Sequence, residues 1–154
     1  MSDYADLIIR LRAGLMDTEE TVWHTAELDE AMRQALADMG LAAGAVYTVT
    51  GLDGALATSL PGQHFSSLVR GAAAYALLWR AIERVEAFNT RPNLPAEVLA
   101  AAAALLARFE TALIHLAALR MTELQTAADS PYPAVTDDVQ AGWTLPDDLS
   151  ASGG

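Results

Sequence analysis

The sequence contains no cysteine and no lysine. Without cysteine, disulfide bonds and thiolate chemistry are excluded. All nine basic residues are arginine, which suits planar, bidentate contacts, although a GC-rich genome explains the same bias without a functional reason. The formal net charge of −11 argues against a general nucleic-acid binder, because such a protein needs a basic face to neutralise phosphates.

Patterns that mark an active site are also missing. The only histidines are His24, His64 and His115, and none has a neighbour at a known metal-ligand spacing. The glycines match neither a phosphate loop nor a dinucleotide fingerprint. The acidic pairs at 19–20 and 137–138 are adjacent residues, which do not face each other on a helix. We therefore expect no catalytic residue, no metal site and no cofactor, and we do not expect an enzyme.

Signals for a membrane or for secretion are weak. The most hydrophobic piece runs from Val98 to Leu119, and Arg108, Glu110 and His115 interrupt it. We therefore expect no run long and uniform enough to span a bilayer. The first four residues lack the basic start of a signal peptide, so synthesis in the cytosol is expected.

Two long amphipathic helices dominate the chain between Pro61 and Ala128. A Pro/Asn break from Phe88 to Pro95 separates them, because a residue before proline leaves the helical region. The second helix is expected to run from Pro95 to about Ala127, which is about 50 Å at ~1.5 Å per residue. Their apolar residues alternate at spacings of three and four, as in nearly antiparallel helices: Phe65, Leu68, Ala72, Tyr75, Trp79 and Ile82, then Leu99, Ala102, Leu106, Phe109, Leu113 and Leu116.

Two shorter helices are predicted before this pair. Residues 3 to 16 form the first, with a periodic apolar face. Thr25 is expected to cap the start of the second helix, and Gly40 is expected to end it. Trp23, just before the cap, is expected to fold back as a hydrophobic staple.

The segment 45–59 carries the only β signal. Val46 to Thr50 are β-branched or aromatic, and Gly51 to Gly54 has turn chemistry. A small hairpin is predicted here, with a structured loop as the alternative. The predicted fold is thus mainly α: residues 1–128 form a four-helix bundle with two short N-terminal helices, this insertion and a long antiparallel pair.

The composition changes abruptly after Ala128. Residues 129–154 hold three prolines, five aspartates and no basic residue, and such a segment cannot bury enough apolar surface to fold alone. We predict an extended tail that binds a partner. Its predicted anchors are the apolar and aromatic residues Tyr132, Pro133, Val135, Trp143 and Leu145.

Several stretches resemble the head–tail adaptor proteins of tailed phages, also called connector or head-completion proteins. The similar stretches are Leu7 to Asp17, then Trp23 to Met39, the run Leu68-Val-Arg-Gly-Ala-Ala-Ala-Tyr-Ala-Leu77, and a late long helix that ends near Arg120. The resemblance covers the layout of residues 5 to 125 and rests on the order and spacing of the helices rather than on a signature motif.

The resemblance implies a structural protein of the virion neck, made in the host cytoplasm. Such proteins form a ring, commonly of twelve copies, beneath the portal, and a C-terminal segment grips the portal protein. The ring receives a stopper or tail-completion protein, and DNA passes through its channel without specific binding. The excess of acidic residues over basic ones suits a channel wall that must not bind DNA.

Two other interpretations stay open at this point. One is another ring of the virion, such as a tail-completion protein. The other is a cytosolic helical bundle that acts as a regulator or binds a small ligand, with Tyr75, Trp79 and Phe109 lining a pocket. An aromatic stripe at helical spacing usually fills a core, however.

Overall fold

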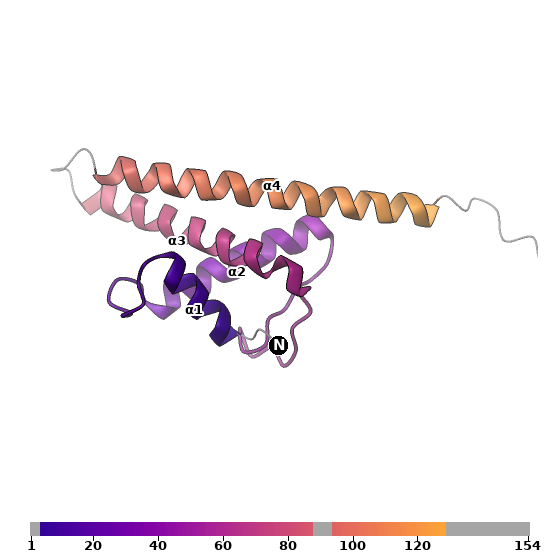
Figure 1. Cartoon of the computed structure of the whole chain (residues 1–154), viewed down its shortest axis with the longest axis horizontal. Coiled ribbons are helices and arrows are strands. Elements are labelled where there is room, and N and C mark those ends of the chain that lie inside the picture. Colours follow the sequence, from indigo (N-terminus) through magenta and orange to yellow (C-terminus); the bar gives the residue numbers. More distant parts are fainter. Residues whose placement is uncertain (1–3, 88–93, 129–154) are drawn as a thin grey trace, which may run out of the picture. The chain divides into compact units, whose positions relative to one another are not determined.

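Four α-helices make up the protein as the computed structural model describes it, over residues 4–87 and 94–128 (Figure 1). These described residues contain no β-strand. The prediction of a mainly α protein with four helices is confirmed. The elements are α1 Tyr4–Gly14, α2 Thr25–Ala43, the 3-10 turn η1 Gly62–His64, α3 Phe65–Ala87 and α4 Leu94–Ala128.

The chain divides into two units, Met1–Met121 and Thr122–Gly154. The division falls inside α4, where residues 121–126 all expose their side chains. The packed core therefore belongs to the first unit.

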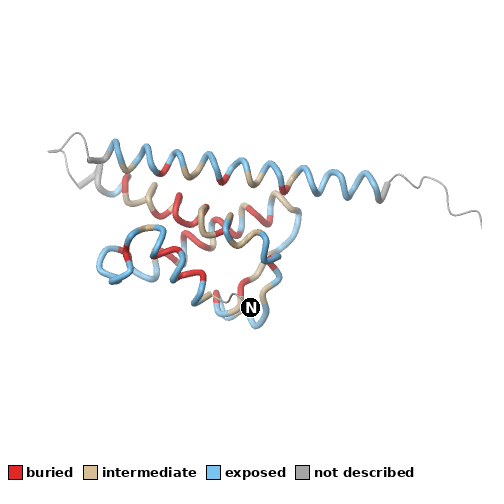
Figure 2. The backbone as a smooth tube through the Cα atoms, in the orientation of Figure 1, coloured by how far each residue is buried: buried red, intermediate tan, exposed pale blue. Residues whose placement is uncertain are grey.

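The pair α2 and α3 forms the centre of that core. From α2, Leu28, Met32 and Met39 are completely buried, and Leu68 and Ala72 of α3 are buried just as fully. Helix α1 also packs against α3. The red positions of Figure 2 accordingly gather on α1, α2 and α3.

Helix α4 adds a narrow buried stripe to this core, spaced by seven residues at Ala102, Phe109 and Leu116. The ring of Phe109 lies over Gly71 of α3, where a side-chain carbon would come within 2.6 Å of it. The buried members of the two predicted contact stripes are Leu68, Ala72, Ala102, Phe109 and Leu116. The facing ends of the two stripes are not covered, because Ile82 is 50% exposed and Leu99 is 45% exposed.

Both predicted ends of α2 need correction. His24 holds the cap position, and its backbone N–H donates to Glu27 Oε2 at 3.1 Å. Thr25 is not the cap, because its hydroxyl instead accepts a hydrogen bond from Arg12. Gly40 does not end the helix either; Gly44 does, at φ +63°. Gly40 stays helical and leaves room for the carbonyl of Ala45, whose N–H bonds back to the Gly40 carbonyl at 2.9 Å.

The segment 45–60 is a loop rather than a β-hairpin. Its two arms are joined largely through hydroxyl groups. The Thr48 N–H donates to Ser59 Oγ at 2.8 Å, and the Thr50 N–H donates to Thr58 Oγ1 at 2.9 Å. Because side chains take the place of opposing carbonyls, no strand ladder forms, and the structured loop is the alternative that holds.

Candidate functional site

The predicted partner-binding residues all lie outside the described part of the chain. Tyr132, Pro133, Val135, Trp143 and Leu145 belong to the segment that follows α4. Their role therefore stays a prediction. The described residues offer two pockets and one exposed helix face as further candidates.

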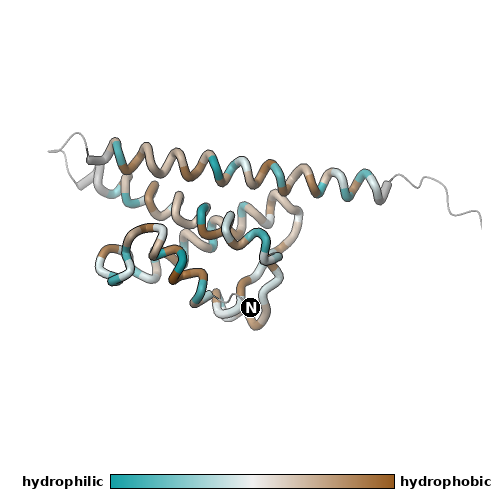
Figure 3. Tube along the Cα trace, viewed as in Figure 1, coloured by the Kyte–Doolittle hydropathy of each residue, from teal (hydrophilic) through white to brown (hydrophobic). Residues whose placement is uncertain are grey.

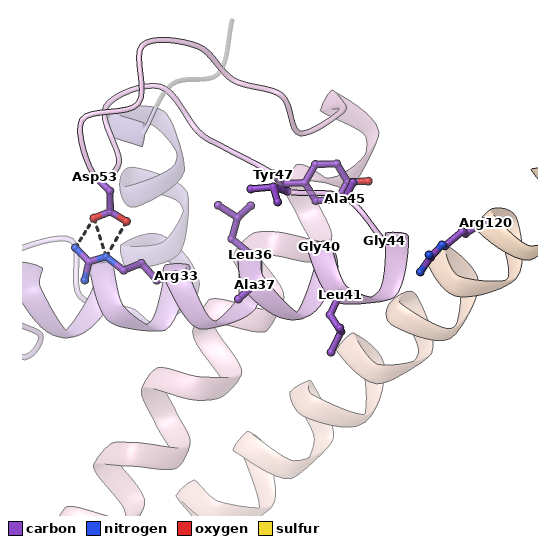
Figure 4. A pocket seen from close by; sticks show the side chains of 11 residues that line it. Arg33, Leu36, Ala37, Gly40, Leu41, Gly44, Ala45, Tyr47, Asp53 and Arg120 are labelled. Carbon is purple, nitrogen blue, oxygen red and sulfur yellow. Dashed lines mark hydrogen bonds and ion pairs between the residues drawn. The ribbon is translucent and has the colours of Figure 1, made fainter.

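The larger pocket lies at the C-terminal end of α2 and has a volume of about 710 Å³ (Figure 4). Its apolar walls come from the end of α2 and from the chain that leaves it. Arg33 and Asp53 stand at one end in Figure 4, and Arg120 of α4 points toward Gly44 at the other. The apolar lining residues are Leu36, Ala37, Leu41, Val46 and Tyr47.

The two arginines of this pocket differ in their partners. Arg33 donates to Asp53 Oδ1 and Oδ2 at 2.8 and 2.9 Å and to Glu30 Oε2 at 2.8 Å. The hydrogen bonds to Asp53, then to Glu30, raise the pKa of Arg33 above its ordinary value. Arg120 is exposed and forms no hydrogen bond or ion pair with the residues that the structure describes. Its guanidinium lies next to Gly44, where an added Cβ would lie 2.1 Å from Cζ.

A second pocket of about 400 Å³ lies between the start of α2 and the second half of α3. Trp23 and Trp79 line it together with Arg80 and three glutamates. Arg80 closes part of it, because its guanidinium lies 4.7 Å from the centroid of the Trp23 ring and donates to the Val22 carbonyl at 2.6 Å. The helical spacing puts Arg80 off the apolar stripe and by itself predicts a solvated charged face, and the contact with Trp23 corrects that prediction.

The aromatic residues suggested as a ligand pocket pack against one another instead. Tyr75 lies 6.0 Å from Trp79 and 6.3 Å from Phe109 between ring centroids. Phe109 is completely buried. The Tyr75 hydroxyl donates to Asp38, and burial followed by this bond raises its pKa well above the ordinary value. Tyr75 and Trp79 are half-buried against the core that contains Phe109, and Trp79 also lines the smaller of the two pockets described above.

One buried ion pair, between Arg12 and Asp17, was not predicted from the sequence. Arg12 is 5% exposed and Asp17 is 2% exposed, and their side chains meet at 3.0 Å. Asp17 accepts the backbone N–H groups of residues 21, 22 and 23, each at 2.9 Å. Burial raises the pKa of Asp17, but these three bonds and Arg12 outweigh it, so the pKa is lowered. The pair fixes the turn between α1 and α2 and faces neither pocket.

No metal site is visible in the described ranges 4–87 and 94–128. They contain no cluster of three or more histidine or acidic side chains that could hold a metal ion. His24 sits at the start of α2, and His64 is the last residue of η1. His115 is exposed on α4.

The outward side of α4 is the most unusual surface. Ala96–Thr126, a run of 31 residues, is long and apolar enough to cross a membrane by length and composition, yet only 11% of its most apolar part is buried. This corrects the expectation that no such run exists, because Arg108 and Glu110 are too few to offset so much alanine and leucine. Along much of α4 the pale blue of Figure 2 coincides with the brown tones of Figure 3.

A stripe of mostly small and apolar residues runs along this exposed side, interrupted by the exposed Glu110, and we call its uncharged members the outer stripe. Its members recur at helical spacings of three, four and seven, so they share one face. All of them are exposed. They are Ala96, Ala100, Ala103, Ala107, Thr111, Ile114 and Met121.

Comparison with known proteins supplies no relative from which a function could be transferred. No protein-family model, no curated protein and no solved structure matches this chain. A function is therefore inferred from the chain's own residues.

Proposed function

We propose that this chain is a structural protein of the neck of a tailed phage, one copy of an adaptor ring between the portal and a stopper or tail-completion protein. The copies pack side by side through their helices, and DNA passes through the ring. Residues 129–154 grip the portal protein through the anchors Tyr132, Pro133, Val135, Trp143 and Leu145.

The observation that carries this proposal is the exposed apolar side of α4. Ile114 is 69% exposed and Met121 is 56% exposed, and Glu110 is the charged residue that shares this face. A large apolar surface of this kind marks a contact with another molecule. The alanines of the stripe would let a neighbouring helix approach closely, which favours a protein assembly.

A lipid bilayer is the other environment that this surface suits, but two features favour protein. If α4 spanned a membrane, Arg108 and Glu110 would lie near the middle of the Ala96–Thr126 run, and a charged side chain there costs about 2.5–3.5 kcal/mol. The opposite side of α4 is also occupied, because Phe109 and Leu116 are buried in the core.

The negative charge of the chain supports a role in which DNA passes by without being bound. A net charge of −11 repels a polyanion and lowers nonspecific binding. A DNA-conducting ring benefits from that repulsion, whereas a nucleic-acid binder would not.

The test is ring formation on the portal protein encoded by the same genome. Full-length chain is mixed with intact portal and imaged by electron microscopy, in parallel with a Trp143→Ala variant. We expect a new ring with the unaltered chain and a much weaker one with the variant, at an unchanged melting temperature. A Leu56→Ala variant serves as the control, because Leu56 is a 96% exposed apolar residue of the loop.

Other outcomes separate the alternatives. A ring that forms without binding the portal would point to another neck component, such as a tail-completion protein. Flotation of the chain with phospholipid vesicles, and no ring on an intact portal, would favour the membrane and reject the adaptor.

A further inference from the structure

We propose that the pocket at the C-terminal end of α2 is a docking site for an acidic, apolar peptide segment of a partner protein. In this site a carboxylate of the segment pairs with Arg120, and an adjacent apolar side chain enters between Leu41 and Val46. The inference does not depend on the identity of the portal or on the adaptor ring.

The cationic end of the site is Arg120. Its guanidinium lies beside Gly44 and has no ion-pair partner among the described residues, whereas Arg33 at the other end is already paired with Asp53 and Glu30. A guanidinium pairs with a carboxylate through two parallel hydrogen bonds. Arg120 is thus the group in the pocket that is ready to accept an anion.

The apolar part of the site is unusually open. Leu41 is 81% exposed and Val46 is 89% exposed, and both line the cavity. Leu36, which is 8% exposed, closes its inner side. Two exposed aliphatic side chains beside a cavity of about 710 Å³ offer room for one large apolar side chain.

Charge complementarity selects an acidic peptide over the other anions. The pocket lining holds two arginines and one aspartate, and because Arg33 is already paired with Asp53 and Glu30, Arg120 supplies the charge available to a ligand. Nucleic acid would need several free cations, whereas the pocket offers Arg120 alone. A small anion such as phosphate could pair with Arg120 but would leave Leu41 and Val46 uncovered.

The experiment uses the full-length chain and a synthetic probe, the acetylated and amidated peptide Asp-Asp-Trp-Leu. Binding is measured by isothermal titration calorimetry, and amide NMR shifts locate the peptide. We expect saturable binding with shifts at Leu41, Gly44 and Val46. The isosteric peptide Asn-Asn-Trp-Leu should bind about tenfold more weakly, because it cannot form the charge-assisted pair.

Two arginine variants of α4 and one leucine variant of α2 test which side chains bind the peptide. Arg120→Gln should weaken binding of the acidic peptide about tenfold. Arg108→Gln, which removes another exposed arginine of α4 outside the pocket, should leave it unchanged. Leu41→Asn, at a position too exposed to be needed for folding, should also weaken binding while circular dichroism stays the same.

Several results would overturn the proposal. They are equal affinity in the Arg120→Gln and Arg108→Gln chains, equal binding of the acidic and amide peptides, or no binding at peptide concentrations of about 1 mM. Inorganic phosphate or a single-stranded oligonucleotide that competes as well as the acidic peptide would also reject it, since the site would then select charge alone.

Discussion

Phe109 of α4 occupies the space that a side chain at position 71 of α3 would need. A Cβ built on Gly71 would lie 2.6 Å from Cε2 and 2.7 Å from Cζ of the Phe109 ring. The ring is completely buried and also meets Tyr75 edge-on. The approach of α4 to α3 at this point therefore depends on glycine.

Gly71→Ala should destabilise the protein even though it is a substitution in the middle of a helix. Glycine to alanine normally gains up to about 1 kcal/mol in a helix. Here Phe109 would have to shift, and overpacking of a core typically costs about 1–3 kcal/mol. We expect a net loss of stability in urea unfolding.

Two controls test this explanation. Gly14→Ala, where nothing lies within 4 Å of the added Cβ, should be close to neutral. Adding Phe109→Leu to the Gly71→Ala chain should cost less than the sum of the two single changes, because the clash disappears. Strict additivity would contradict the proposed contact.

Gly44→Ala should combine two penalties. The residue has φ +63°, and its Cβ would collide with the Arg120 guanidinium. The left-handed conformation alone costs roughly 1 kcal/mol for alanine. Gly54→Ala supplies the reference, because Gly54 has φ +75° and nothing within 4 Å.

The difference between these two glycine variants measures the contact with Arg120. We expect Gly44→Ala to be the more destabilising and to weaken binding of the acidic peptide by displacing the guanidinium. Equal unfolding free energies and unchanged peptide affinity would show that Arg120 moves away without consequence.

Asp17→Asn should remove part of the pH dependence of stability. The pKa of Asp17 is lower in the folded chain than its ordinary value of 3.8. The contribution of this carboxylate is therefore complete above about pH 4 and declines as the pH falls through the folded pKa. The variant should be less stable at neutral pH, because Arg12 loses its buried partner, and should lose less stability between pH 5 and pH 3.

The control for this titration is Glu20→Gln. Glu20 lies 3.6 Å from Arg12 Nε but its side chain is 67% exposed. Its removal should change the melting temperature little at either pH. An Asp17→Asn chain whose stability declines in acid as steeply as that of the unaltered chain would contradict the assignment.

Arg80→Gln should loosen the turn before α2. The change removes the cation–π contact with Trp23 and the bond to the Val22 carbonyl, each worth about 0.5–1.5 kcal/mol. We expect a loss of about 1–2 kcal/mol and a red shift of tryptophan emission as Trp23 becomes exposed. Arg70→Gln, on the same helix and outside this contact, should leave the emission unchanged.

Much of the helical layout could be read from local spacing alone. The predicted helix from Pro95 to about Ala127 is observed as Leu94–Ala128, because long periodic runs and a Pro/Asn break are local signals. The turn residues of segment 45–60 could also be predicted from the sequence. Its hydroxyl bonds were not, because they depend on which side chains the two arms bring together.

The pockets could not be predicted, since they join residues from distant parts of the chain. Arg120 meets Gly44 only because α4 passes the end of α2. Arg80 of α3 contacts Trp23, which lies just before α2 and 57 positions earlier in the chain. The burial of Arg12 with Asp17 likewise follows from packing, although the two lie close in sequence.

The sequence by itself determined the mainly α class, the four helices and the acidic tail, because periodicity and composition act over a few turns of chain. The tertiary structure decided which apolar residues are covered. Phe109 is hidden over Gly71 while Ile114, five residues later on the same helix, remains 69% exposed. The physical reason is that the amount of apolar surface is set by the residues, whereas its burial depends on what packs against each side of the helix.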